Sequence, residues 1–272
     1  MVKVTRTKLP VGLLAHWKRV VLVIVALLII GGAVYYFAFV QLYKSDYAHM
    51  LTSVNRVTTT YNDLLSARDD AVDKLGQSDE EFSKAVSSYR QKYTNYSEQS
   101  GSLVGERANR DSAVQAAYQS LREHNDGFGR FVATQFDRLP LVHSVVLDCS
   151  EDAPSKLNTS DLAKIVEVYD GAMKSCTEAM KHLADSNDAV VKKRGSDNVT
   201  YFDAMRTHVV AMQTAYTASD RSTFESEYNA LLEALAQYEA HIQVRDLLDI
   251  DKNTVPATQL NALATLLSQH QR

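Results

Sequence analysis

An uninterrupted apolar run occupies residues 20–40 and is the strongest pattern in the chain. Its 21 residues, VVLVIVALLIIGGAVYYFAFV, carry no charged side chain. As an α-helix the run would be about 31 Å long at ~1.5 Å per residue, which matches a bilayer hydrocarbon core of ~30 Å. Backbone amides in lipid must pair within their own segment, so a helix is the expected conformation. The pattern predicts a transmembrane helix over residues 20–40.

The flanking charges predict how this helix is oriented. A cleaved signal peptide is the alternative, but the apolar core of a signal peptide is only about 7–15 residues long. Only Lys44 and Arg56 follow the run within about 20 residues, the range over which charge bias acts. Five basic residues precede it: Lys3, Arg6, Lys8, Lys18 and Arg19. Residues 1–19 are therefore expected to form a short basic cytoplasmic tail, and residues 41–272 to be extracytoplasmic.

Residues 41–148 are expected to form a helical stem close to the membrane. Apolar residues recur there at alternating spacings of three and four, as in the seam of a coiled coil. Arg68 is the one polar residue at a seam position of this first segment. The segment ends at Gly76-Gln77-Ser78. Ser78 with Glu81 forms a capping box that begins a second helix. The predicted interaction seam consists of Met50, Val54, Val57, Tyr61 and Leu64.

The break after the first seam leaves two arrangements open. The two helical segments could fold back on each other as an antiparallel hairpin, or the first seam could pair in parallel with a second copy of the chain. The second segment carries an aromatic stripe, Tyr89, Tyr93 and Tyr96. Such rings could stack on sugars or on a partner, although large seam residues are the simpler interpretation.

Residues 149–272 are expected to form an extracytoplasmic helical bundle. Apolar stripes with helical spacing recur from residue 162 onward, separated by a predicted turn at 194–198 and by a capping box at Ser222 and Glu225. No segment shows the period of two that is typical of a strand. The predicted fold class is all-α: a single transmembrane helix, a coiled-coil-like stem and a helical bundle.

Two cysteines, Cys149 and Cys176, are candidates for a structural disulfide. When a chain outside the cytoplasm has only two cysteines, they are expected to be oxidised to a disulfide. The bond requires the two Cα atoms to come within ~7 Å, so the intervening chain would have to run back along the helix that carries Cys176. Two separate buried thiols are the alternative. The sequence has no C-x-x-C motif, so a redox site is not expected.

A calcium loop is the only metal site that the sequence suggests, and its pattern is incomplete. Asp249, Asp251 and Asn253 have the spacing of the first three oxygen ligands of such a loop. Thr254 stands where the loop needs glycine, and Leu260 stands where it needs a bidentate glutamate. A polar connection between helices, with Asn253 or Thr254 capping the last helix, is the simpler explanation of the motif. No metal and no cofactor are therefore expected.

Charge and motifs limit the function classes. The chain has 29 Lys+Arg and 33 Asp+Glu, and the five basic residues before the apolar run leave a net charge of −9 on residues 41–272. That balance argues against nucleic-acid binding. The chain has no G-x-S-x-G, P-loop or dinucleotide-binding motif, so no enzymatic role is expected.

The expected function is a membrane-anchored scaffold or protein-interaction module at the cell envelope or surface. Its partner would be another protein or a second copy of the chain. The alternative is a sensory or small-ligand-binding bundle. That alternative needs a separate membrane partner, because a tail of about 19 residues has no room for a signalling domain.

Overall fold

The computed structural model describes residues 11–36, 41–150, 161–250 and 255–271 of the chain. Within these residues the structure is helical and contains no strand, which confirms the predicted all-α class. The nine helices of the described part are α1 (Val11–Tyr35), α2 (Lys44–Asp73), α3 (Asp79–Ser102), α4 (Ser112–Ser150), α5 (Leu162–Ala184), α6 (Ala189–Thr217), α7 (Arg221–Leu235), α8 (Tyr238–Ile242) and α9 (Ala257–Gln269).

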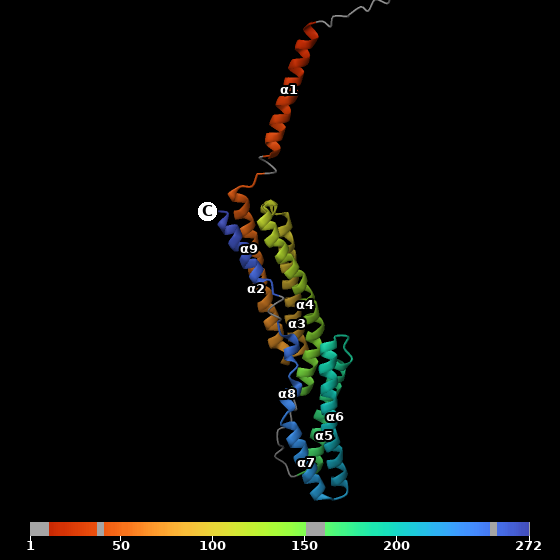
Figure 1. Ribbon diagram of the computed structural model, residues 1–272. Helices are drawn as coiled ribbons and strands as arrows, with labels where there is room; N and C mark the ends of the chain where they lie inside the picture. Colours follow the sequence, from red (N-terminus) through yellow and green to blue (C-terminus); the bar gives the residue numbers. More distant parts are fainter. Residues whose placement is uncertain (1–10, 37–40, 151–160, 251–254, 272) are drawn as a thin grey trace, which may run out of the picture.

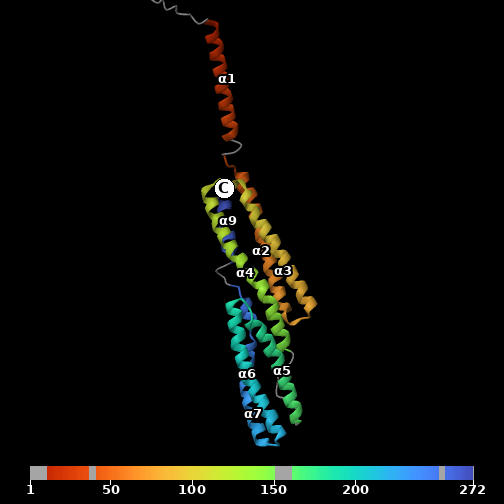
Figure 2. The same cartoon turned by 90° about the vertical axis from the view of Figure 1, so that its right-hand side faces the viewer.

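Helix α1 extends away from the other described helices in both views (Figures 1 and 2). The large apolar side chains that the structure describes on this helix are exposed, from 41% for Val21 to 69% for Leu28. Of the helices in the described part of the chain, none combines the length and the hydropathy of a membrane span. The last residues of the predicted span, 37–40, and the first part of the predicted tail, 1–10, lie outside the described residues.

The remaining helices form an elongated rod of two bundles that share α4 (Figure 1). The proximal bundle, near α1, consists of α2, α3 and α9 packed with the first part of α4. The distal bundle consists of the end of α4 with α5, α6, α7 and α8. Helix α4 has 39 residues, which corresponds to about 58 Å at ~1.5 Å per residue, and is therefore long enough to enter both bundles.

Helices α2 and α3 form the antiparallel hairpin that was one of the two arrangements left open. The connection lies at the predicted break, where the 3₁₀ turn η2 (Lys74–Gly76) follows α2 and Ser78 caps α3. The Ser78 hydroxyl accepts a hydrogen bond from the backbone N–H of Glu81. The acidic first turn of α3 also complements the positive end of the helix dipole.

The structure divides the outer part differently from the prediction. The predicted boundary at 148/149 falls inside α4, and α9 packs on α2 and α4 of the predicted stem. Pro140 lies within α4, whose helical structure continues to Ser150. The chain therefore returns to the proximal bundle after completing the distal one.

The turn predicted at 194–198 is wrong, because these residues lie inside α6. A Cβ atom at Gly195 would come within 2.2 Å of the backbone nitrogen of Ala184 and 2.6 Å of the carbonyl carbon of Leu183. Gly195 is thus required where α6 crosses the end of α5 at close range, and its backbone remains helical. The actual turn between these helices ends at Asp188, whose carboxylate accepts hydrogen bonds from the backbone N–H groups of Val190 and Val191 in the first turn of α6.

Two arginines hold the chain that connects the distal bundle to α9. Arg68 of α2 donates to the carbonyl of Leu248, and Arg138 of α4 donates to the carbonyl of Leu247 at 2.7 Å. Arg138 also pairs with the carboxylate of Asp188, with Nε 2.8 Å from Oδ2. Arg68, the one polar residue in the predicted seam, therefore has a structural role at the joint between the two bundles.

A disulfide joins the end of α4 to the middle of α5. The sulfur atoms of Cys149 and Cys176 are 2.03 Å apart and the Cα atoms 4.8 Å apart. The hydroxyl of Tyr238 in α8 donates to the carbonyl of Cys149 at 2.7 Å. Both cysteines are buried, at 2% and 0% exposure. This covalent link lies within the core of the distal bundle.

Candidate functional site: a groove between helices α3 and α4

A hollow of about 730 Å³ lies between α3 and α4 on the proximal bundle. Aromatic side chains join the two helices there. On the solvent side of these contacts, small side chains leave the hollow open. We call it the α3–α4 groove. Its lining residues are Tyr93, Tyr96, Ser97, Ser100, Gly101, Val104, Tyr118, Arg122, Asn125, Asp126, Gly129, Arg130 and Ala133.

Two of the three residues of the predicted aromatic stripe line this groove. Tyr96 is 2% exposed, and its ring centroid lies 5.9 Å from that of Phe128 in α4. Tyr93 is half-buried and makes an edge contact with Phe136 at 6.2 Å. Tyr89, the third member, is 1% exposed and packs on Phe136 outside the groove. The stripe therefore joins α3 to α4, and Tyr93 and Tyr96 form the aromatic base of the groove.

The buried tyrosine of the groove is a neutral hydrogen-bonding group. The Tyr96 hydroxyl donates to Oδ1 of Asn125 at 2.5 Å. Burial raises the pKa of Tyr96 well above its ordinary value. Burial also raises the pKa of Tyr118, and the nearby Arg122 offsets part of that effect. Both phenols keep their protons at neutral pH, so they can position a bound group but cannot serve as general bases there.

Gly129 makes room for the hydroxyl of Tyr93. A Cβ atom at position 129 would lie 2.9 Å from Oη of Tyr93. The absence of a side chain at this point lets the phenol lie across α4. The sequence prediction missed Gly129 and the whole α4 side of the groove. The available signal was a pair of glycines, Gly127 and Gly129, inside a long helix.

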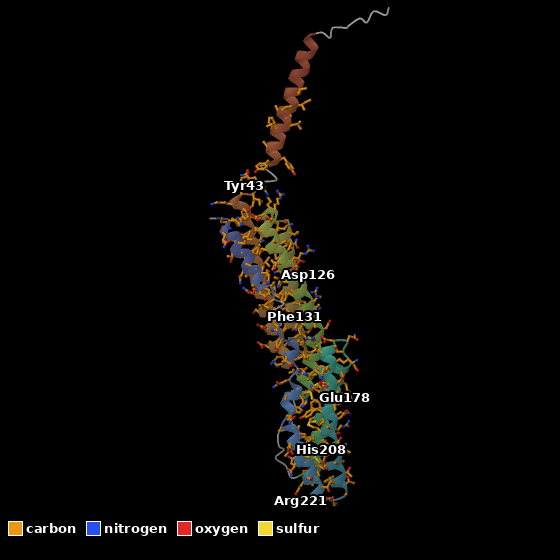
Figure 3. The ribbon with its side chains drawn as sticks, viewed as in Figure 1. Tyr43, Asp126, Phe131, Glu178, His208 and Arg221 are labelled. Atoms are coloured by element: carbon orange, nitrogen blue, oxygen red, sulfur yellow. A yellow bond between two sulfur atoms is a disulfide. The ribbon has the colours of Figure 1, made fainter. Side chains whose placement is uncertain are left out.

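The rim of the groove on α4 is charged. Arg122, Asp126 and Arg130 are exposed and follow one another at intervals of four residues, which places them on one face of the helix. Figure 3 shows Asp126 on α4 in the proximal bundle. An aromatic base with a polar rim is the usual composition of a surface that binds a protein or a small molecule.

The predicted interaction seam is part of the protein's own core. Its five residues are no more than 4% exposed, because α3 and α9 pack against α2. This burial corrects the expectation that the seam faces a partner. The spacing of three and four identified the buried face of α2, but it could not identify which helix covers that face. The seam residues are Met50, Val54, Val57, Tyr61 and Leu64.

The candidate calcium loop falls largely outside the described residues. Asp249 is described and exposed, whereas Asp251 and Asn253 lie in the segment 251–254. Among the residues whose positions the structure gives, no group of three or more His, Cys, Asp or Glu side chains could hold a metal ion.

No known protein family, no curated protein and no solved structure matches this chain.

Proposed function

We propose that this chain is a single-pass membrane protein whose helical rod lies outside the cytoplasm and binds a partner protein through the α3–α4 groove. The proposed membrane anchor is supported mainly by the exposed apolar side chains of α1. Leu27, Leu28 and Ile29 are each more than 60% exposed, and both neighbouring turns are apolar as well. Such a surface is strongly disfavoured in water and is stable in hydrocarbon.

The five basic residues before the apolar run 20–40 support a cytoplasmic N-terminus. The disulfide is a second argument for this orientation, because lone disulfides persist mainly in oxidising compartments. The anchor is then residues 20–40, and both bundles lie on the extracytoplasmic side of the membrane. A role in binding agrees with neutral tyrosines in the groove better than a role in catalysis does.

The groove is the proposed partner site because the seam of α2 is already occupied by α3 and α9. Small residues on both helices, Ser97 and Gly101 on α3 and Gly129 and Ala133 on α4, leave a hollow along the helix axes. A helix of the partner protein fits such a surface. Its apolar side chains would contact the base of the groove, and its charged side chains would lie opposite the charged rim.

Photo-crosslinking in native membranes tests this proposal. A photoreactive residue in place of Arg130, on the rim, should give a discrete adduct with a partner protein. Ser97→Trp, which fills the groove, should abolish the adduct. Ser87→Trp is the matched control, because Ser87 is an exposed serine of the same helix that does not line the groove. An adduct that survives Ser97→Trp would exclude the groove as the partner site.

The volume of the groove favours one alternative, a small-ligand-binding bundle that acts with a separate membrane partner. About 730 Å³ lies within the range of ~300–1,000 Å³ typical of ligand pockets. A ligand-dependent rise in melting temperature that Ser97→Trp removes and Ser87→Trp preserves, without a protein adduct from position 130, would favour this alternative.

A further inference from the structure

The corner between α3 and α4 is fixed against the start of α2. This corner contains the 3₁₀ turns η3 (Leu103–Gly105) and η4 (Arg107–Arg110). Nη2 of Arg107 donates to the carbonyl of Gln41 at 3.2 Å. Glu106 accepts a hydrogen bond from the hydroxyl of Ser53 at 2.6 Å. Figures 1 and 2 agree that the corner lies at the end of the rod that faces α1.

Gln41 directly follows the proposed membrane span of residues 20–40. A bilayer has ~30 Å of hydrocarbon and ~40–45 Å in total, so each headgroup layer is only ~5–8 Å thick. A guanidinium in hydrogen-bonding contact with the first residue after the span therefore lies within or directly above the headgroups. The bond between Arg107 and Gln41 brings the whole α3–α4 corner to the membrane surface.

An apolar side chain projects from this corner. Val104 is 65% exposed, the highest value among the large apolar side chains described in residues 41–272. It lies on the rim of a second hollow of about 360 Å³ beside η4. Tyr43, which Figure 3 labels at the same end of the rod, is 40% exposed. Apolar and aromatic side chains at headgroup depth are stabilised by partial burial in the interface.

The charges at the corner are balanced, so attraction to anionic lipid would contribute little. Three basic and three acidic residues lie in or beside the two turns and the start of α2: Lys44, Arg107, Arg110, Asp46, Glu106 and Asp111. Contact of the corner with the membrane would therefore depend on the apolar Val104 and would not require a particular headgroup charge.

We propose that the α3–α4 corner docks on the outer leaflet of the same membrane that holds α1, with Val104 at the boundary between headgroups and acyl chains. This inference rests on the proposed anchor. Docking gives the rod a second attachment to the bilayer and restrains its tilt. Val104 and Tyr118 line both hollows, so docking also places one end of the α3–α4 groove beside the lipid.

Depth-dependent quenching of a fluorophore in the full chain tests the docking. Cys149 and Cys176 are joined, so one introduced cysteine supplies the reactive thiol. Val104→Cys and the control Val210→Cys, whose native valine is 57% exposed and lies in the distal bundle, are each labelled with an environment-sensitive dye. The proteins are reconstituted in phosphatidylcholine vesicles with or without a nitroxide near the top of the acyl chains.

Docking predicts about a twofold loss of emission at position 104 in nitroxide vesicles, and no loss at position 210. The same loss is expected when part of the lipid is replaced by phosphatidylglycerol. Equal emission at both positions, or quenching only with the anionic lipid, would overturn the docking through Val104. Failure of the full chain to float with vesicles after an alkaline wash would instead overturn the anchor, and the docking with it.

Discussion

Replacing Gly195 with alanine should destabilise the protein, although alanine is the better helix former. The exchange gains about 1 kcal/mol of helix propensity. The added Cβ would lie 2.2 Å from the backbone nitrogen of Ala184 and 2.7 Å from Cβ of Leu183, whereas carbon contacts are favourable at ~3.5–4.0 Å. Two of the three nearest atoms belong to the backbone and cannot rotate away, so α5 and α6 must separate.

Overpacking of this kind costs about 3 kcal/mol at the upper end of its usual range. After the gain in propensity is subtracted, the free energy of unfolding of Gly195→Ala should fall by about 2 kcal/mol. Gly171→Ala is the matched control, because Gly171 is an exposed residue inside α5 and a Cβ there meets no atom within 4 Å. Its free energy of unfolding should rise by up to about 1 kcal/mol.

Urea unfolding of the full chain in detergent, followed by far-UV circular dichroism under non-reducing conditions, measures both changes. The two variants should shift the transition midpoint in opposite directions with similar slopes. A Gly195→Ala protein as stable as the wild type would show that α5 and α6 do not cross as closely as described. Destabilisation by Gly171→Ala would show that its helix has a neighbour at that face.

Three further perturbations test the joint, the disulfide and the core. Burial raises the pKa of Asp188, but its hydrogen bonds with Arg138 and the amides of α6 lower it more, so the net pKa is below 3.8. The stability lost in Asp188→Asn, about 1–2 kcal/mol, should be constant above about pH 5 and shrink as the pH falls further, as measured by urea midpoints. Changing both Cys149 and Cys176 to alanine should cost about 3.5 kcal/mol, because the bond closes a loop with a sequence separation of 27; calorimetry should show a lower melting temperature. Val57→Asp places a carboxylate at a position that is 1% exposed, so it should unfold the proximal bundle and reduce the helical signal rather than only weaken association between copies.

Local periodicity predicted most of the helices because each has one buried face. The seam of α2 is buried where the spacing of three and four placed it, and α5 has a buried face in the region where apolar stripes were predicted from residue 162 onward. Ser78 caps α3 as its hydroxyl and position predicted. These features depend on residues within one or two turns of each other, so the sequence carries them directly.

The partners of each helix could not be predicted in the same way. The pattern of α2 is equally compatible with a second copy of the chain, but in the structure α3 and α9 cover it. Helix α9 begins more than 180 residues after the end of α2, and no local signal indicates that it returns to the proximal bundle. Glycines were ambiguous for the same reason, since Gly195 marks a close helix crossing and Gly76 marks a turn.

The candidate site was only half visible in the sequence. The tyrosines of α3 stood out because of their spacing, and the structure places Tyr93 and Tyr96 in the groove. The other wall comes from α4, where Asn125 and Gly129 gain their roles only through contact with those tyrosines. A groove depends on the distance between two helices, and that distance is set by packing throughout the bundle.

Labelling of introduced cysteines with a membrane-impermeant maleimide tests most directly whether the rod lies outside the cytoplasm. Val190 is 58% exposed in α6, and Thr5 lies in the predicted cytoplasmic tail. With the proposed orientation, Val190→Cys is labelled on intact cells, whereas Thr5→Cys is labelled only after the membrane is permeabilised. Labelling of Thr5→Cys on intact cells, with Val190→Cys protected, would contradict the proposed anchor and orientation.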